Sequence, residues 1–326
     1  MNFKNTVQLV NKMLTDNKEW ISRFTNYADE ILMNLQAHVD GRSRFQEPTQ
    51  FTFHTAISNL KETGVLRYDI RFFGQSVATI KIKKGDVVIS TSKKDSNNLK
   101  YFGVDIPLRD DKWSGGKARR FRKEFKNCRE EKGRSPEHKM EAMLLSEFKR
   151  TDRSTKSLCN IQPVLLAKCF FQMATPLKAS SKEISYSNTK GGIDILSRVR
   201  HKDNSTRLCV MELKDEYTKS EPPEKVMQQA VAYATFIANL LRSDSGDKWY
   251  QIFGFKGSTP ENLTIDVAIV MPSPANGMFE DFNKERIEVL DNTFIEIYAL
   301  YFNEKDKFFG GDSFGFIGSL KDAMMK

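Results

Sequence analysis

The second half of the chain has an order of strand-like and helix-like segments that few folds accommodate. An apolar strand-like run at 161–172 precedes two apolar segments that flank a polar loop at 201–206, as in a β-hairpin. A long helical pattern at 223–242 follows, and then come two more strand-like segments at 264–273 and 293–302. A strand, a hairpin, a helix and two strands predict an α/β fold in which helices flank a mixed sheet.

The amino-terminal third shows another pattern, that of helices followed by antiparallel strands. Two helical patterns cover residues 5–38, and an apolar stripe at 20–35 would serve as core or as the contact of a homodimer. From 50 to about 105 apolar and polar residues tend to alternate, and turn signals at 74–75 and 84–86 predict an antiparallel meander.

A chain of 326 residues is long enough for two domains. We expect an amino-terminal domain at 1–110, with the helices and the meander, that recognises a substrate. A basic connecting segment covers 111–134, and the α/β domain covers 135–326. The hydrophobic content of 39% and the charged content of 29% are typical of a soluble globular protein.

The net charge of +9 favours a polyanionic partner such as nucleic acid. Much of the charge lies in the connecting segment, where basic residues are interleaved with Phe121 and Phe125. The pattern fits a solvated helix face that the phenylalanines anchor, or a helix that contacts phosphate groups. In the second case the nucleic-acid-binding residues are Lys117, Arg119, Arg120, Arg122, Lys123 and Lys126.

One face of the meander is also basic, with Arg67, Arg71, Lys81 and Lys83. Antiparallel sheets commonly expose one face to water, so solvation is the favoured interpretation of these residues. Contact of this face with a nucleic-acid duplex is the alternative.

No run of about eighteen apolar residues occurs, so we expect no transmembrane helix and no membrane partner. Charges are spread through the first twenty residues, which lack the apolar stretch of a signal peptide. We therefore expect an intracellular, cytoplasmic protein. Four scattered cysteines without a CxxC pair indicate structural thiols rather than a zinc site: Cys128, Cys159, Cys169 and Cys209.

Three charged residues interrupt the apolar hairpin: Asp194 in its first strand, and Glu212 and Lys214 in its second. With residues 201–206 as the loop, position 194 pairs with about 213, so Asp194 and Glu212 lie nearly opposite each other. Lys214 lies two residues beyond Glu212 and therefore on the same face of its strand.

Two carboxylates this close repel each other, and a cation between them allows both to remain ionised. Magnesium binds oxygen ligands and typically uses one or two carboxylates together with water and substrate phosphate. A nearby lysine would stabilise charge on a phosphate, so the three residues fit phosphodiester hydrolysis. The alternative is an ordinary ion pair on a solvated strand face.

The surrounding motifs resemble those of the PD-(D/E)XK nuclease superfamily. Asp194 lies in "GGID", Glu212 and Lys214 lie in "MELK", and a Gln-x-x-x-Tyr pattern in "QQAVAY" is similar to the RecB-like branch. The resemblance covers about 135–302 and leaves the amino-terminal part unexplained. The chain departs from the pattern at Ile193, where the superfamily name-motif has proline.

The resemblance implies a core like that of restriction endonucleases and a magnesium site in which manganese can substitute. Asp194, Glu212 and the backbone carbonyl of Leu213 would bind the metal, and Lys214 would be the catalytic lysine. Gln229 and Tyr233, one turn apart on the following helix, would face the active site. From the pattern alone Tyr233 belongs to the packing stripe of that helix.

The resemblance also implies an acid on the first helix of the domain. Glu141 fits this role, close to the metal directly or through water, and Glu137 one turn earlier is the alternative. Glu141 lies in an otherwise apolar stripe, where a carboxylate costs free energy unless a partner pairs with it.

We therefore expect a magnesium-dependent deoxyribonuclease, with DNA favoured over RNA by the resemblance. Cleavage within a strand, as by an endonuclease, and cleavage from an end both fit the motifs. The competing interpretations are a catalytically silent nucleic-acid-binding module of the same fold, a structural or interaction protein, and a metal-dependent phosphoesterase for small substrates.

Overall fold

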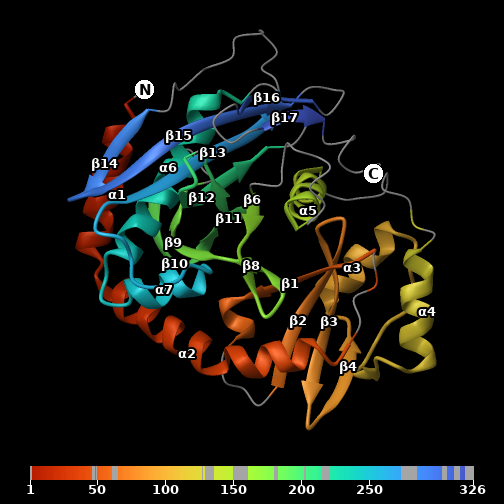
Figure 1. Cartoon of the computed structure of the whole chain (residues 1–326). Coiled ribbons are helices and arrows are strands. Elements are labelled where there is room, and N and C mark those ends of the chain that lie inside the picture. The colour runs from red at the N-terminus through yellow and green to blue at the C-terminus, as the bar shows by residue number, and fades with distance from the viewer. Residues whose placement is uncertain are drawn as a thin grey trace. The chain divides into compact units, whose positions relative to one another are not determined.

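The structure, a computed structural model, describes residues 2–45, 48, 50–60, 65–126, 128, 136–149, 161–179, 183–201, 203–214, 221–272, 285–302, 307–311 and 316–319. It forms two compact units (Figure 1). The large unit comprises Met1–Asp29, Leu144–Val164 and Gln172–Lys326, and the small unit comprises Glu30–Met143 and Leu165–Phe171. The chain enters each unit more than once, so these units differ from the successive ranges expected from the sequence.

The large unit contains a mixed sheet with the order β17-β16-β15-β13-β12-β11-β6, and β14 pairs with β15 (Figure 1). Strand β12 is parallel to β13 and β13 to β15, whereas β11 is antiparallel to β12 and β6 to β11. The strands are β6 (Ile161–Pro163), β11 (Ile195–Arg200), β12 (Thr206–Leu213), β13 (Leu263–Pro272), β14 (Arg286–Leu290), β15 (Thr293–Phe302), β16 (Lys307–Gly311) and β17 (Phe316–Ser319). The prediction of an α/β fold with a mixed sheet is confirmed.

Helix α6 (Pro223–Leu241) packs against β12, β13 and β15, and α1 (Phe3–Asp16) packs against α6 (Figure 1). Proline at the first position of α6 suits a helix start. Proline has no backbone N–H group, and an N–H group at this position would have no intrahelical partner. Apolar side chains cover most of the α6 surface, as in a helix buried on several sides. The short helix α7 (Gly246–Ile252) follows and buries Trp249.

The single strand predicted at 161–172 is wrong, because the chain reverses within it. Strands β7 (Leu165–Leu166) and β8 (Cys169–Gln172) are joined by a tight turn at Ala167 and Lys168, which have φ angles of 49° and 59°. Glycine and asparagine are the usual residues at such angles, so no turn signal marks this position in the sequence.

A two-stranded sheet that the sequence did not predict leads into the hairpin. It consists of β9 (Ala174–Lys178) and β10 (Ser185–Gly192), which are antiparallel. Gly191 allows the two backbones to approach closely, since a Cβ atom there would lie 1.6 Å from the Leu177 carbonyl oxygen. The side chain of Thr175 is also near, at 2.4 Å from the same Cβ position.

Replacing Gly191 with alanine should therefore destabilise the large unit by about 3 kcal/mol, the upper part of the range for overpacking. Gly192→Ala is the matched control, because its Cβ would meet no atom nearer than the Met173 carbonyl oxygen at 4.0 Å. Chemical denaturation of both variants measures the difference. Equal stability of the two would contradict the close approach of β9 and β10.

The small unit contains a sheet with the order β5-β4-β3-β2-β1-β8-β7. Besides β7 and β8, its strands are β1 (Thr52–Ala56), β2 (Val65–Phe72), β3 (Gln75–Lys83), β4 (Asp86–Ser90) and β5 (Asp111–Lys112). The antiparallel meander predicted between 50 and about 105 is confirmed in β2, β3 and β4, with turns at Phe73–Gly74 and Lys84–Gly85 where every φ is positive. Ala78, Ile80 and Ile82 are buried on one face as predicted.

Helices α3 (Lys93–Tyr101) and α4 (Gly116–Phe125) complete the described part of the small unit. The chain passes between the units within α2 (Glu19–Arg42) and within α5 (Pro136–Lys149). The two amino-terminal helices predicted at 5–38 are thus α1 and α2. Along α2 the stripe predicted at 20–35 is buried in part, at Trp20, Phe24, Ala28 and Ile31.

In the part of the chain that the structure describes, no helix is both long enough and apolar enough to cross a lipid bilayer.

Candidate active site

Asp194 and Glu212 occupy opposed positions of the β11–β12 hairpin. The observed register pairs Ile195 with Met211, and one further step along it brings Asp194 opposite Glu212. The predicted partner of position 194 was about 213, one residue away. Asp194 lies just before β11, and the Leu213 backbone N–H donates to its Oδ2 at 2.9 Å, which holds the carboxylate against the end of β12.

Glu212 is an acid within a central strand, and Lys214 contacts it. Only 2% of Glu212 is exposed, and Lys214 Nζ donates to its Oε1 at 3.2 Å. The backbone N–H of Lys214 donates to the Val270 carbonyl at 2.9 Å, so the lysine follows β12 alongside β13. A buried carboxylate needs such a partner, because removing its charge from water is costly.

Tyr233 on α6 is in electrostatic contact with both acids. Burial raises the pKa of Tyr233, and the charges of Glu212 and Asp194 raise it further, whereas hydrogen bonds with the Ala179 backbone and the Gln229 side chain oppose these effects. Gln229, 9% exposed, has in this tyrosine the hydrogen-bond partner that a buried amide needs.

The residues of this site suit a hard divalent cation. Asp194 and Glu212 offer carboxylate oxygens from neighbouring strands, and magnesium takes few protein oxygens and keeps several waters. No group of three or more His, Cys, Asp or Glu side chains close enough for a metal occurs among the described residues. A site formed by two acids, with a backbone carbonyl such as that of Leu213, therefore fits magnesium and does not fit zinc.

Glu141, expected at the metal, lies on α5 in the small unit, whereas Asp194, Glu212 and Lys214 belong to the large unit. It is 6% exposed, and its carboxylate lies 3.5 Å from Arg71 Nη1 and 3.4 Å from His138 Nδ1. These contacts supply the partner that an acid in an apolar stripe requires. The competing acid, Glu137, is partly buried on the same helix.

Five of the six basic residues at 117–126 lie on α4, as the helical interpretation required, and Lys126 adjoins its end. Phe121 and Phe125 are buried and anchor the helix. Arg122 differs from its basic neighbours, because its guanidinium lies 4.0 Å from the Trp113 ring centre and donates to the Trp113 carbonyl. The exposed members of the set are Lys117, Arg119, Arg120, Lys123 and Lys126.

Two acids of the small unit pair with three of the four cations on the basic face of the meander. Lys81 and Lys83 contact the two carboxylate oxygens of Asp110 at 3.1 and 2.6 Å, and Arg71 pairs with Glu141. Hydrogen bonds from both lysines keep the pKa of Asp110 below its ordinary value, and the Lys83 bond has the larger effect. These pairs favour the interpretation of a solvated face.

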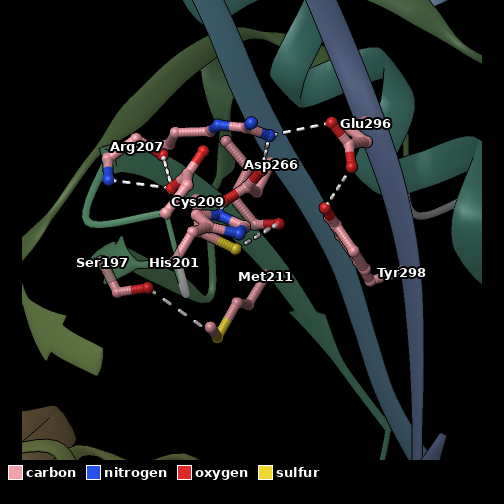
Figure 2. A network of polar contacts seen from close by, with 11 residues as sticks. Ser197, His201, Arg207, Cys209, Met211, Asp266, Glu296 and Tyr298 are labelled. Atoms are coloured by element: carbon pink, nitrogen blue, oxygen red, sulfur yellow. Dashed lines mark hydrogen bonds and ion pairs between the residues drawn. The ribbon is translucent and has the colours of Figure 1, made fainter. Parts of the chain in front are cut away.

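A second polar cluster, which the sequence did not predict, crosses the opposite face of the large sheet (Figure 2). Cys209, Asp266 and Glu296 pair in register across β12, β13 and β15. Glu212 lies three residues after Cys209, so its side chain points to the other face of β12. The cluster is therefore separate from the candidate active site.

Asp266 is fully buried at the centre of this cluster. His201 Nε2 lies 2.7 Å from Asp266 Oδ2, and Arg207 Nη1 lies 3.4 Å from its Oδ1. As Figure 2 shows, Arg207 also donates to Glu296 at 2.8 Å, and the Tyr298 hydroxyl donates to the same carboxylate at 2.5 Å. Two acids, one arginine, one histidine and one tyrosine thus form a continuous network.

The electrostatics of the network indicate a structural role. Burial raises the pKa of Asp266, against the hydrogen bond to His201 and the charge of Arg207. The nearby Cys209 is completely buried, and burial raises the pKa of its thiol, which keeps it protonated and inert. The hints in the sequence were the acids inside two apolar runs, "TIDVAIV" and "TFIEIYALYF".

Comparison with known proteins assigns this geometry to no family. A scan with models of protein families gave no match, and neither the curated proteins nor the solved structures gave a significant one. What the site can do therefore follows from its own side chains and their surroundings.

Proposed function

We propose that this chain is a magnesium-dependent nuclease that hydrolyses phosphodiester bonds of DNA. The observation that carries the proposal is the pair of opposed acids, Asp194 and Glu212, with Lys214 in contact with Glu212. Burial of Glu212 in a central strand argues against an ordinary solvated ion pair. A mixed sheet with α6 packed on it is compatible with a core like that of restriction endonucleases.

In this proposal Asp194 and Glu212, with the backbone carbonyl of Leu213, hold a magnesium or manganese ion. A bound ion of this kind lowers the pKa of a water and shields the charge of a phosphodiester. Asp194 is oriented for its role by the Leu213 N–H, and Lys214 stabilises negative charge that develops on the phosphate. Glu141 remains a proposed further acid of the site.

Gln229 and Tyr233 orient the reacting groups in the same proposal. The Tyr233 hydroxyl is hydrogen-bonded to Gln229 and coupled electrostatically to Glu212. The raised pKa of Tyr233 keeps its hydroxyl protonated, so it can donate to a carboxylate or a phosphate oxygen. Gln229 fixes the orientation of that hydroxyl.

The test is cleavage of duplex, single-stranded and branched DNA by the full chain with magnesium or manganese. Lys214→Ala should cleave about 10²–10³-fold more slowly, as expected for loss of a group that stabilises transition-state charge. EDTA should stop cleavage by the wild type. Equal cleavage by both proteins would refute the role of Lys214 and point to another active site or a contaminant.

A catalytically silent nucleic-acid-binding module is the second candidate, because the exposed cations of α4 would also serve a protein that only binds. It predicts binding to DNA without cleavage and without thermal stabilisation by magnesium. For a purely structural protein we expect no binding to DNA, no cleavage and no thermal stabilisation by magnesium.

A further inference from the structure

The outer side of α4 carries a row of cations. Ala118, Phe121 and Phe125 are buried and fix which side of the helix faces the unit's interior. Arg119, Lys123 and the adjoining Lys126 are exposed and follow each other at intervals of four and three residues. This spacing aligns them along one side of the helix over about 10 Å, at 1.5 Å per residue.

Three other exposed cations of the same unit have acidic partners. Lys117 lies 3.4 Å from Asp111, Arg120 lies 3.8 Å from Glu124, and Lys112 lies 3.9 Å from Asp86. Within the described ranges no carboxylate contacts any of the three residues of the row. The row therefore concentrates positive charge that the described acids of the small unit do not neutralise.

The support beneath the row is well packed. Arg122 stacks on Trp113, and its backbone carbonyl accepts a hydrogen bond from Gln50 at 2.9 Å. The Phe125 ring packs against Phe72 with a centroid distance of 4.7 Å. The three cations thus project from a helix whose position is fixed, while their long side chains can adapt to a ligand.

We propose that Arg119, Lys123 and Lys126 bind the sugar–phosphate backbone of duplex DNA without reading its bases. Long, exposed cations suit phosphate oxygens. Both phenylalanines of α4 are buried, so the helix itself offers no aromatic surface on which the bases of a single strand could stack. The identification of DNA as the polyanion rests on the proposed nuclease function. The assignment of the row as a phosphate-binding site does not depend on that function.

The experiment measures binding of a labelled duplex of arbitrary sequence to the full chain at several salt concentrations, in EDTA and with Lys214→Ala as background. The test variant is Arg119→Gln/Lys123→Gln/Lys126→Gln. The matched control is Lys81→Gln/Lys83→Gln/Lys112→Gln, which removes the same charge from residues that pair with Asp110 and Asp86.

The test variant should bind about 10²-fold more weakly at moderate salt, and its slope of log K against log salt should fall by about 2.7, as for three lost phosphate contacts. The control should bind within about three-fold of the background protein. Single-stranded DNA should bind more weakly than the duplex. Equal losses in both variants, or no loss in either, would overturn the proposal.

Two further arms complete the design. If anionic phospholipid vesicles bind the background protein and lose binding in the test variant, while duplex binding is unchanged, the row serves a membrane and the proposal fails. If the triple variant does not fold, Lys123→Glu alone should still reduce the slope by about one or more. If the wild type never cleaves DNA but the test variant still loses duplex binding, the phosphate-binding row is supported and only the nuclease function is refuted.

Discussion

Arg207→Met should lower the free energy of unfolding by about 3–5 kcal/mol, the range for breaking a buried ion pair by removing one partner. Asp266 is fully buried, and without Arg207 His201 is the one cationic partner left to it among the described residues. Glu296 would lose its contact with the guanidinium at the same time. Methionine fills a similar volume, so the loss should come from electrostatics rather than from a cavity.

Asp266→Asn supplies the control for this prediction. The amide keeps the shape of the side chain and removes the buried charge, so Arg207→Met should cost much less in the Asp266→Asn background. Denaturant unfolding of the wild type, both single variants and the double variant gives the coupling energy. Additive losses would show that the pair does not act as a unit.

The pH dependence gives an independent check. Burial already raises the pKa of Asp266, and loss of the Arg207 charge should raise it further. A carboxyl whose pKa is raised in the folded state contributes stability that is fully present below its pKa in the unfolded chain. This stability is lost as the pH rises through the folded-state pKa. The difference in stability between wild type and Arg207→Met should therefore widen as the pH rises through that window.

The elements with a strong period were predictable from local sequence. Alternation and glycine turns identified the meander, and proline together with an apolar stripe identified α6. The hairpin register was within one residue, because a short polar loop limits which residues can pair. Local patterns were sufficient for these elements, but not for the pairs β7–β8 and β9–β10, although their strands are also close in sequence.

Features that depend on distant residues were not predictable. The reversal at Ala167–Lys168 uses residues that rarely adopt positive φ, and the close approach at Gly191 depends on the Leu177 backbone. Two of the four crossings between the units lie within continuous helices, α2 and α5. A helical pattern carries no sign of such a crossing.

The same distinction applies to the polar residues. Asp194, Glu212 and Lys214 could be brought together from sequence, since one hairpin holds all three. The Asp266 network joins β12, β13 and β15, and the parallel pairing of these strands is not encoded in any one segment. Arg71 as the partner of Glu141 was hidden for the same reason, because 70 residues separate them.

Asp194→Asn should abolish stabilisation by magnesium and reduce DNA cleavage by about 10³-fold or more, if the proposed nuclease site is correct. Asparagine keeps an oxygen that can accept from the Leu213 N–H, so the hairpin should remain folded while one anionic metal ligand is lost. A ligand at about 100 times its Kd stabilises the fold by about 2.7 kcal/mol, which thermal unfolding with and without magnesium detects.

Two comparison variants separate metal binding from chemistry and from charge. Lys214→Ala should keep the stabilisation by magnesium while cleavage falls, because the lysine contacts Glu212 and is not itself a metal ligand. Asp203→Asn removes an acid from the exposed loop of the same hairpin and should change neither property. Stabilisation by magnesium that persists in Asp194→Asn would remove the metal from this pair of acids, and with it the basis for phosphodiester hydrolysis at the hairpin.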